Sequence, residues 1–227
     1  MHAMPPASSL RRLAGALAVL CIVVAVVLAG RPSFTNASRP PRGVPDPVVA
    51  IEVAQSIGDV DDILGDAPSP DREVMRVKQY IDFGFIAAYL PLFLTLAMLL
   101  SRQPGWPRAA GMAALVCAVA TAAFDVRENL SILRILDVPL RSTSAAMINA
   151  IRGASAAKWA LVAVTEALLA ALFLSFSGWP MRAIGALIAA SAAGVAYGFD
   201  DPRFLVWQSY PTFLALLGVA ALWCRWR

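Results

Sequence analysis

The sequence predicts an all-α polytopic transmembrane helix bundle with about six spans. The chain of 227 residues is 59% hydrophobic and only 15% charged, and its mean hydropathy is +0.67. Its apolar residues form long uncharged blocks, each near the length that crosses about 30 Å of hydrocarbon as a helix. A soluble domain of this size does not need so much apolar sequence. The composition also excludes disordered, collagen-like and disulfide-scaffold proteins.

The first apolar block covers residues 13–30 and follows Arg11 and Arg12. At 1.5 Å per residue it crosses most of a hydrocarbon core. Residues 1–30 are therefore predicted to be an uncleaved signal anchor or first transmembrane helix. A cleaved signal peptide is the alternative, because Val27, Leu28 and Ala29 form a tolerable cleavage site.

Residues 31–78 have a different composition, with seven prolines and more than half of the acidic residues of the chain. We expect an extracytoplasmic segment that is too short for a core of its own. Its apolar residues recur at helical spacing opposite three aspartates, which predicts one amphipathic helix lying on the membrane or on the bundle, or else serving as a partner-binding site. They are Val49, Val53, Ile57, Val60 and Leu64. Ser69 followed by Pro70 predicts the start of a helix that continues into the next span.

Five further apolar blocks follow. They cover residues 83–100, 109–124, 159–176, 183–199 and 204–223. We assign residues 79–176 to the core membrane helices and 177–227 to two further transmembrane helices, of which Pro211 is expected to kink the last. Small residues at every fourth position of the fifth span predict a close helix contact. These are Ala186, Ala190, Gly194 and Gly198.

The charge distribution predicts the orientation. If the N-terminus is cytoplasmic, the inside segments contain arginines and no Asp or Glu, which favours cytoplasmic N- and C-termini in the plasma (cell inner) membrane. These arginines are Arg11, Arg12, Arg102, Arg108, Arg182, Arg225 and Arg227.

Several ionisable or polar residues lie within the predicted spans, where each needs a partner or water and so marks a candidate site. With the orientation above, most of them fall at one depth near the extracytoplasmic face. They are Asp82, Asp125, Glu128, Asn129 and Lys158, and Tyr89 extends the stripe inward from Asp82. Glu166 lies about two turns deeper with no cation in its own span, and we expect it to be neutral at pH 7 unless it meets a cation.

Asp125, Glu128 and Asn129 share one helix face. That face could accept a cation, a proton or an amine, or it could simply bond Lys158 and hold helices together. The leading interpretation is ligand, ion or proton handling at the outer-leaflet polar cluster. One alternative is a structural or assembly protein that scaffolds partners through the small-residue face of residues 183–199. A third is a lipid-modifying membrane enzyme whose carboxylates hold a divalent metal.

Signatures of catalysis are absent from the sequence, so an enzyme is not favoured and no catalytic, cofactor-binding or metal residues are predicted. His2 is the single histidine and lies near the N-terminus. The basic residues are dispersed, which argues against nucleic acid as a partner. The expected partners are the lipid bilayer and, for a transporter of this size, further copies of the chain in a homo-oligomer. The sequence names no small ligand.

Four stretches resemble a loosely defined group of uncharacterised bacterial membrane proteins. They are residues 52–56 (EVAQS), 80–89 (YIDFGFIAAY), 122–129 (AAFDVREN) and 157–159 (AKW). The group shares a helix with Asp-Phe-x-Phe-Ile-x-x-Tyr, a second with Asp-x-x-Glu-Asn and a third that opens with Lys. The resemblance covers about residues 48–176 and implies a four-helix core unit to which the last two spans are an addition. It implies no activity.

Overall fold

The computed structural model describes residues 7–30, 32–35, 43–102 and 104–224, and every regular element in these ranges is a helix. Six stretches are long and apolar enough to cross a membrane, so the chain is an integral membrane protein with the predicted all-α fold. They are α1 (Ala7–Ala29), α4 (Pro70–Leu100), α5 (Trp106–Leu136), α6 (Ala145–Leu174), α7 (Trp179–Gly198), and a last span formed by α8 (Arg203–Trp207) and α9 (Ser209–Cys224).

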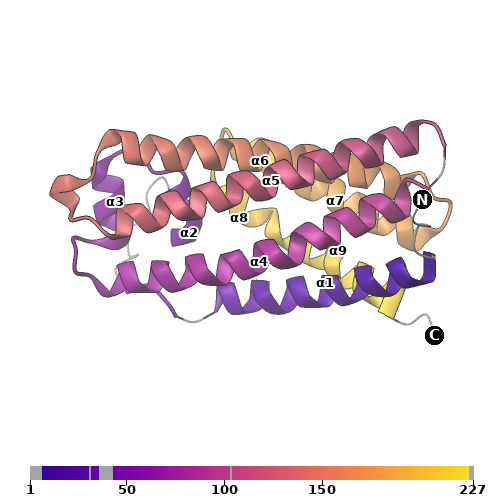
Figure 1. Cartoon of the computed structure of the whole chain (residues 1–227), viewed down its shortest axis with the longest axis horizontal. Helices are drawn as coiled ribbons and strands as arrows, with labels where there is room; N and C mark the ends of the chain where they lie inside the picture. Colours follow the sequence, from indigo (N-terminus) through magenta and orange to yellow (C-terminus); the bar gives the residue numbers. More distant parts are fainter. Residues whose placement is uncertain (1–6, 31, 36–42, 103, 225–227) are drawn as a thin grey trace, which may run out of the picture.

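The six spans form an elongated up-and-down bundle (Figure 1). Each span packs on the one that follows it in the chain, and α9 also packs on α1, so that the helices close into a ring in the order α1, α4, α5, α6, α7, α9. Because neighbours along the ring run in opposite directions, short connections join the spans from α4 to the last one, whereas residues 30–69 join α1 to α4. The main apolar core lies within this ring and draws on α1, α4, α5, α6, α7 and α9.

Three spans are much longer than their apolar blocks. Helices α4 and α5 have 31 residues each and α6 has 30, or about 45 Å, whereas α7 has 20 residues, or about 30 Å. The predicted start of α4 is confirmed, because Ser69 accepts a hydrogen bond from the Asp71 amide and Pro70 occupies the first turn. Since the α4–α5 and α6–α7 connections lie at the same end of the bundle, the excess length of α4, α5 and α6 projects at the other end (Figure 1).

Exposed aromatic side chains mark both edges of the membrane-embedded part. Trp106 and Trp179 open α5 and α7 at one edge, and Tyr197, Trp207 and Tyr210 surround the corner between α7 and α8 at the other. Aromatic rings of this kind prefer the membrane interface. The two levels are about 30 Å apart along α7, which matches the thickness of a hydrocarbon core.

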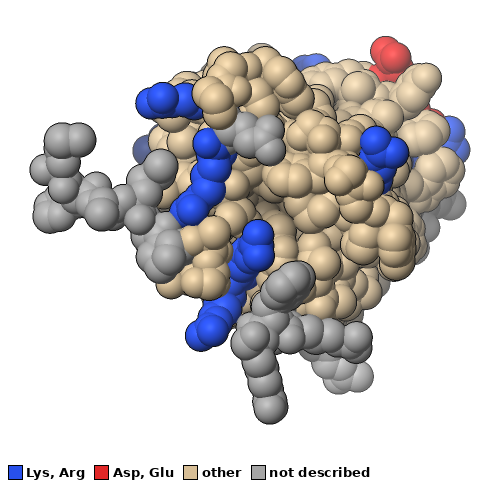
Figure 2. All heavy atoms as spheres, turned by 90° about the vertical axis from the view of Figure 1, so that its right-hand side faces the viewer, with Lys and Arg blue, Asp and Glu red and all other residues tan. Residues whose placement is uncertain are grey.

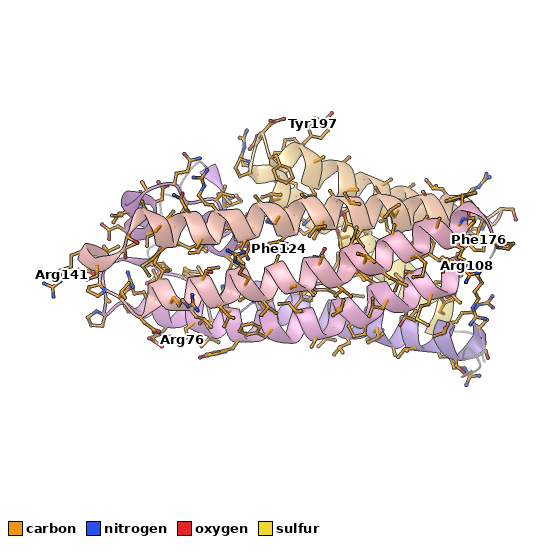
Figure 3. The ribbon with its side chains drawn as sticks, turned by 45° about the horizontal axis from the view of Figure 1, so that its top comes forward. Arg76, Arg108, Phe124, Arg141, Phe176 and Tyr197 are labelled. Carbon is orange, nitrogen blue, oxygen red and sulfur yellow. The ribbon has the colours of Figure 1, made fainter. Side chains whose placement is uncertain are left out.

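The two ends of the molecule differ in charge. Figure 2 looks onto the end that contains the start of α1 and the connections α4–α5 and α6–α7, and Lys and Arg side chains lie on it. We call this the basic end, and Arg108 and Phe176 lie there in Figure 3. Of the arginines used for the orientation, Arg225 and Arg227 are outside the described residues, as is His2. Arg141 lies at the opposite end, which we call the capped end.

The capped end carries two short helices where the sequence predicted one. These are α2 (Pro47–Glu52) and α3 (Ile57–Leu64), which together we call the cap. The single-helix prediction was wrong because Ser56 is an N-cap: its hydroxyl accepts from the Asp59 amide, and the Asp59 carboxylate accepts from the Ser56 amide. The apolar residues keep their helical spacing through Ser56, so the spacing alone does not reveal that the helix is interrupted there. Gly65, at φ 65°, ends α3.

The capped end packs on the bundle and is not free in solvent. A second apolar core joins α2 and α3 to the projecting parts of three spans, namely the start of α4, the end of α5 and the start of α6. Arg72 of α4 strengthens this joint, because its guanidinium donates to the carbonyls of Ile135, Leu136 and Val138 at the C-terminus of α5, and to that of Gly65. The segment therefore has no core of its own, as expected, but shares one with three spans.

The last span is interrupted. Pro211 was expected to kink it, and the helix is interrupted at Gln208, between α8 and α9. Proline has no amide hydrogen to donate to the carbonyl four residues earlier, that of Trp207. Gly194 and Gly198 of α7 allow the close approach of this region, since a Cβ at Gly194 would lie 2.8 Å from Gln208 Cβ and one at Gly198 would lie 2.3 Å from Leu205 Cδ2. Half of the predicted small-residue face is thus occupied within the chain.

Helix α1 is an integral part of the bundle. Its residues Leu10, Ala14 and Ala18 are buried in the main core against α4 and α9. The ammonium of Lys78 donates to the carbonyls of Leu28 and Gly30 at 2.6 and 3.3 Å, and so caps the C-terminus of α1. Cleavage after residue 29 would remove the Leu28 carbonyl and the packing of α1.

We predict that Ala18→Leu lowers the free energy of unfolding by about 1–3 kcal/mol, because Ala18 has no exposed surface and the larger side chain overpacks the core. The matched control is Val19→Leu, on the exposed face of the same helix, which should leave stability unchanged. Thermal unfolding of the purified protein in detergent measures both. Equal stability of the two variants would mean that the mature protein has lost α1.

Candidate functional site

The ammonium of Lys158, on α6, lies among three carboxyl groups. Its Nζ is 2.7 Å from Glu128 Oε1, 3.1 Å from Glu52 Oε1 and 3.5 Å from Asp125 Oδ1. All four residues are buried. Because Asp125 and Glu128 come from α5 and Glu52 from α2, this one side chain links two spans to the cap. We call these residues, together with Asp82, Tyr89, Asn129 and Trp159, the Lys158 cluster.

Glu52 closes the cluster from the capped end. One oxygen accepts from Lys158 and the other accepts from the indole N–H of Trp159 at 2.6 Å. Asp46 positions this residue, since its side chain caps the N-terminus of α2, which Glu52 ends. Burial raises the pKa of Glu52 above its usual value, although the Lys158 ammonium and the Trp159 N–H oppose this shift.

Helices α4 and α5 add two direct hydrogen bonds. The phenol of Tyr89 donates to Asp125 Oδ2 at 2.9 Å, and the amide of Asn129 donates to Asp82 Oδ2 at 2.7 Å. Asp82 is only partly buried, at the edge of the cluster. Asp125, Glu128 and Asn129 are all buried on one face of α5.

The level of the cluster follows from helix length. Counted from the basic end, the twentieth residue is Ile81 in α4, Asp125 itself in α5 and Ser155 in α6, so each count ends within one turn of Asp82, Asp125 or Lys158. At 1.5 Å per residue this is about 30 Å, so the cluster lies at the membrane edge nearer the cap. In Figure 3, Phe124, the neighbour of Asp125, lies well inside the two ends of the molecule. The cluster is therefore covered by the cap and not at helix ends, where the apolar blocks alone had placed it.

Negative groups outnumber positive ones in this cluster. Among the described residues, the cluster contains four carboxyl groups, those of Glu52, Asp82, Asp125 and Glu128, and one ammonium. If all ionised, they would leave three negative charges without a counter-charge in a poorly solvated site. In addition, Glu128 Oε2 is buried with no hydrogen-bond partner among the described residues. The arrangement can therefore hold further positive charge, as protons or as a small cation.

Glu166 is not part of the Lys158 cluster. It lies eight residues further along α6, about 12 Å closer to the basic end, as the predicted depth required. Its Oε1 is 3.1 Å from Ser191 Oγ on α7, which also lies 2.6 Å from Thr212 Oγ1 on α9. All the partners that the described residues give it are neutral.

Sequence reasoning missed several residues of these two groups as site residues. Glu52 and Trp159 stood in the stretches that carried the family resemblance but were not taken as candidates. An acid flanked by Ile51 and Val53 in an otherwise apolar face was the available signal for Glu52. Ser191 and Thr212 had none, because single hydroxyls in apolar helices are common.

We predict that Lys158→Met lowers the free energy of unfolding by about 3–5 kcal/mol at pH 7, because it leaves buried carboxylates without their cation. The double variant with Glu128→Gln should recover part of this loss. Arg127→Met is the matched control, since Arg127 is exposed on α5, and should change stability by less than about 0.5 kcal/mol. Denaturation in detergent tests all three; equal losses for Lys158→Met and Arg127→Met would contradict the buried ion pairs.

A pH dependence follows from Glu52. Because its pKa is raised in the folded protein, its contribution to stability is complete below the unfolded value of about 4.5 and is lost as the pH rises through the folded value. Melting temperatures between pH 4 and 8 should therefore fall more for the wild type than for Glu52→Gln. Asp66 gives the opposite sign, because the Leu140 amide lowers its pKa and its contribution is lost as the pH falls. Parallel curves for wild type and Glu52→Gln would contradict this assignment.

Comparison with known proteins identifies no relative: no family model, no curated protein and no solved structure matches the chain. The resemblance to bacterial membrane proteins with the Asp-Phe-x-Phe-Ile-x-x-Tyr and Asp-x-x-Glu-Asn helices therefore stays a prediction.

Proposed function

We propose that this protein handles protons or small cations, binding them in the Lys158 cluster at the outer edge of the membrane. The observation that carries the proposal is the excess of buried carboxyl groups over ammonium groups, together with the unpartnered oxygen of Glu128. A site that only held helices together would need as many positive as negative groups, or none of either. Anionic ligands are disfavoured by the same charge.

The proposed orientation places the basic end in the cytoplasm and the cap outside, in the plasma membrane. Arginines at the basic end and the absence of acids from its described connecting segments support it. The Lys158 cluster then lies at the extracytoplasmic edge, covered by α2, and among its carboxyl groups Asp82 is the partly exposed one. A cation arriving from outside would meet Asp82 first.

Two other functions are less well supported. An assembly role was expected to use the small residues of α7, but Gly194 and Gly198 contact Gln208 and Leu205 of the last span in the same chain. A metal-dependent lipid enzyme needs carboxylates around an ion, and here the ammonium of Lys158 occupies the centre between them. Among the described residues no group of three or more His, Cys, Asp or Glu side chains is arranged for a metal.

The experiment is a flux measurement in proteoliposomes of the full chain, with H⁺, Na⁺ and K⁺ each imposed as a gradient. We expect Asp125→Asn to reduce the flux of the transported cation by at least about tenfold, the effect of losing roughly 1.4 kcal/mol of binding. Asparagine keeps the size of the side chain and can still bond Tyr89. Asp62→Asn, on the exposed surface of α3, is the control and should retain wild-type flux.

Two outcomes would contradict the proposal. One is wild-type flux in the folded Asp125→Asn protein. The other is a wild type that carries none of the three cations while Asp125→Asn only lowers the amount of folded protein, because the cluster would then be a purely structural joint.

A further inference from the structure

Around Glu166, the oxygen atoms make more contacts at hydrogen-bonding distance than there are hydroxyl hydrogens to bridge them. Ser191 Oγ lies 3.1 Å from Glu166 Oε1, 2.6 Å from Thr212 Oγ1 and 2.9 Å from Gln208 Oε1. Thr212 Oγ1 lies 2.9 Å from the backbone carbonyl oxygen of Gln208 and 3.0 Å from its side-chain oxygen. Four residues from α6, α7 and the last span thus form one connected group, which we call the Glu166 chain.

Counting hydrogens indicates the protonation state that fits this geometry. Ser191 and Thr212 supply one hydroxyl hydrogen each. With Glu166 ionised, its carboxylate would have one donor, and its buried Oε2 has no partner among the described residues. One proton on Glu166 Oε1 completes a directed series: Glu166 donates to Ser191, Ser191 to Thr212, and Thr212 to the Gln208 carbonyl. Each hydrogen then has its own acceptor.

The charges around Glu166 support the neutral form independently. Ser191 faces it from α7, and Thr212 and Gln208 complete the group from the last span, so every one of these neighbours is uncharged. No charged side chain of the described residues interacts electrostatically with the Glu166 carboxyl group. Glu166 lies near the middle of the bilayer, about 12 Å from the level of Lys158, where an unpaired carboxylate is costly.

The chain of hydrogen bonds ends at the break between α8 and α9. Because Pro211 has no amide hydrogen, the last span is interrupted here, and the Gln208 carbonyl accepts from both the Thr212 side chain and its amide. Irregular backbone at membrane depth occurs where it is buried in protein or lines water, and broken helices are a common setting for ion sites in transporters.

From this geometry we propose that Glu166 is a second proton-binding site, separate from the Lys158 cluster. Ser191 and Thr212 form the hydrogen-bonded chain that connects its proton to the break at Gln208. The ligand is a proton and no metal cation: the oxygens are 2.6–3.1 Å apart, as in hydrogen bonds, and one proton completes the series from Glu166 through Ser191 and Thr212 to the Gln208 backbone carbonyl. This inference does not depend on the function proposed for Asp125.

The test is infrared spectroscopy of the full-length protein in lipid at pH 7 in sodium buffer. Glu166→Gln should remove one carbonyl-stretch band of a protonated carboxyl group. Ser191→Ala should keep that band but shift it to higher frequency, because it removes the acceptor of the Glu166 proton. Thr212→Val should shift it less, since Thr212 acts one step away. Glu73→Gln, an exposed acid at the capped end of α4, is the control and should leave the band unchanged.

Several results would overturn the proposal. The first is that Glu166→Gln removes bands of an ionised carboxylate. The second is a protonated-carboxyl band that Ser191→Ala does not shift. The third is a band that appears only when sodium is replaced by a bulky organic cation, because the occupant would then be a metal cation. If Glu166→Gln does not fold, the Ser191→Ala shift decides alone. Cation flux through wild type and Asp125→Asn is measured separately, so failure of one proposal is distinguishable from failure of the other.

Discussion

The ammonium of Lys158 joins three separate parts of the molecule, α6, α5 and the cap, at one buried point. Through Glu128 it ties α6 to α5, and through Glu52 it ties both to the cap. Each partner is buried, so no member of the set can be removed without leaving another unsatisfied. The position of α2 depends on this requirement, because Glu52 must reach the membrane edge to meet Lys158 and Trp159. The projecting ends of α4, α5 and α6 then provide the apolar surface on which the cap packs.

The two polar groups solve the problem of buried carboxyl groups in different ways. In the Lys158 cluster an ammonium, a phenol and an indole N–H share the carboxylate oxygens, and negative groups remain in excess. Around Glu166 the described residues supply only neutral oxygens, so a proton takes the place of the cation. The first group lies at the membrane edge under the cap and the second near the middle of the bilayer. Lys158 and Glu166, the residues after which the two groups are named, both lie on α6, eight residues apart.

Sequence patterns predicted well those features that depend on one segment at a time. The six spans, the Ser69–Pro70 start of α4 and the shared face of Asp125, Glu128 and Asn129 all follow from local periodicity and capping chemistry. The division of the cap into α2 and α3 was missed, because apolar spacing continues through Ser56 while its capping hydrogen bonds interrupt the helix. The full length of α4, α5 and α6 was missed too, since hydropathy reports the lipid-facing part of a helix and not its extension into a cap.

The sequence by itself determined that this chain is a membrane protein and which helix faces carry polar groups. The reason is that contact with lipid restricts the composition of every span and the helical spacing of its polar residues. Only the tertiary structure decided the partners: Glu52, 106 residues from Lys158, and Ser191, 25 residues from Glu166. Contacts between separate helices depend on how each helix is rotated about its axis and on the packing order around the ring. The helix rotations and the packing order are set by all the helix interfaces together, so no local pattern in the sequence of one segment reports them.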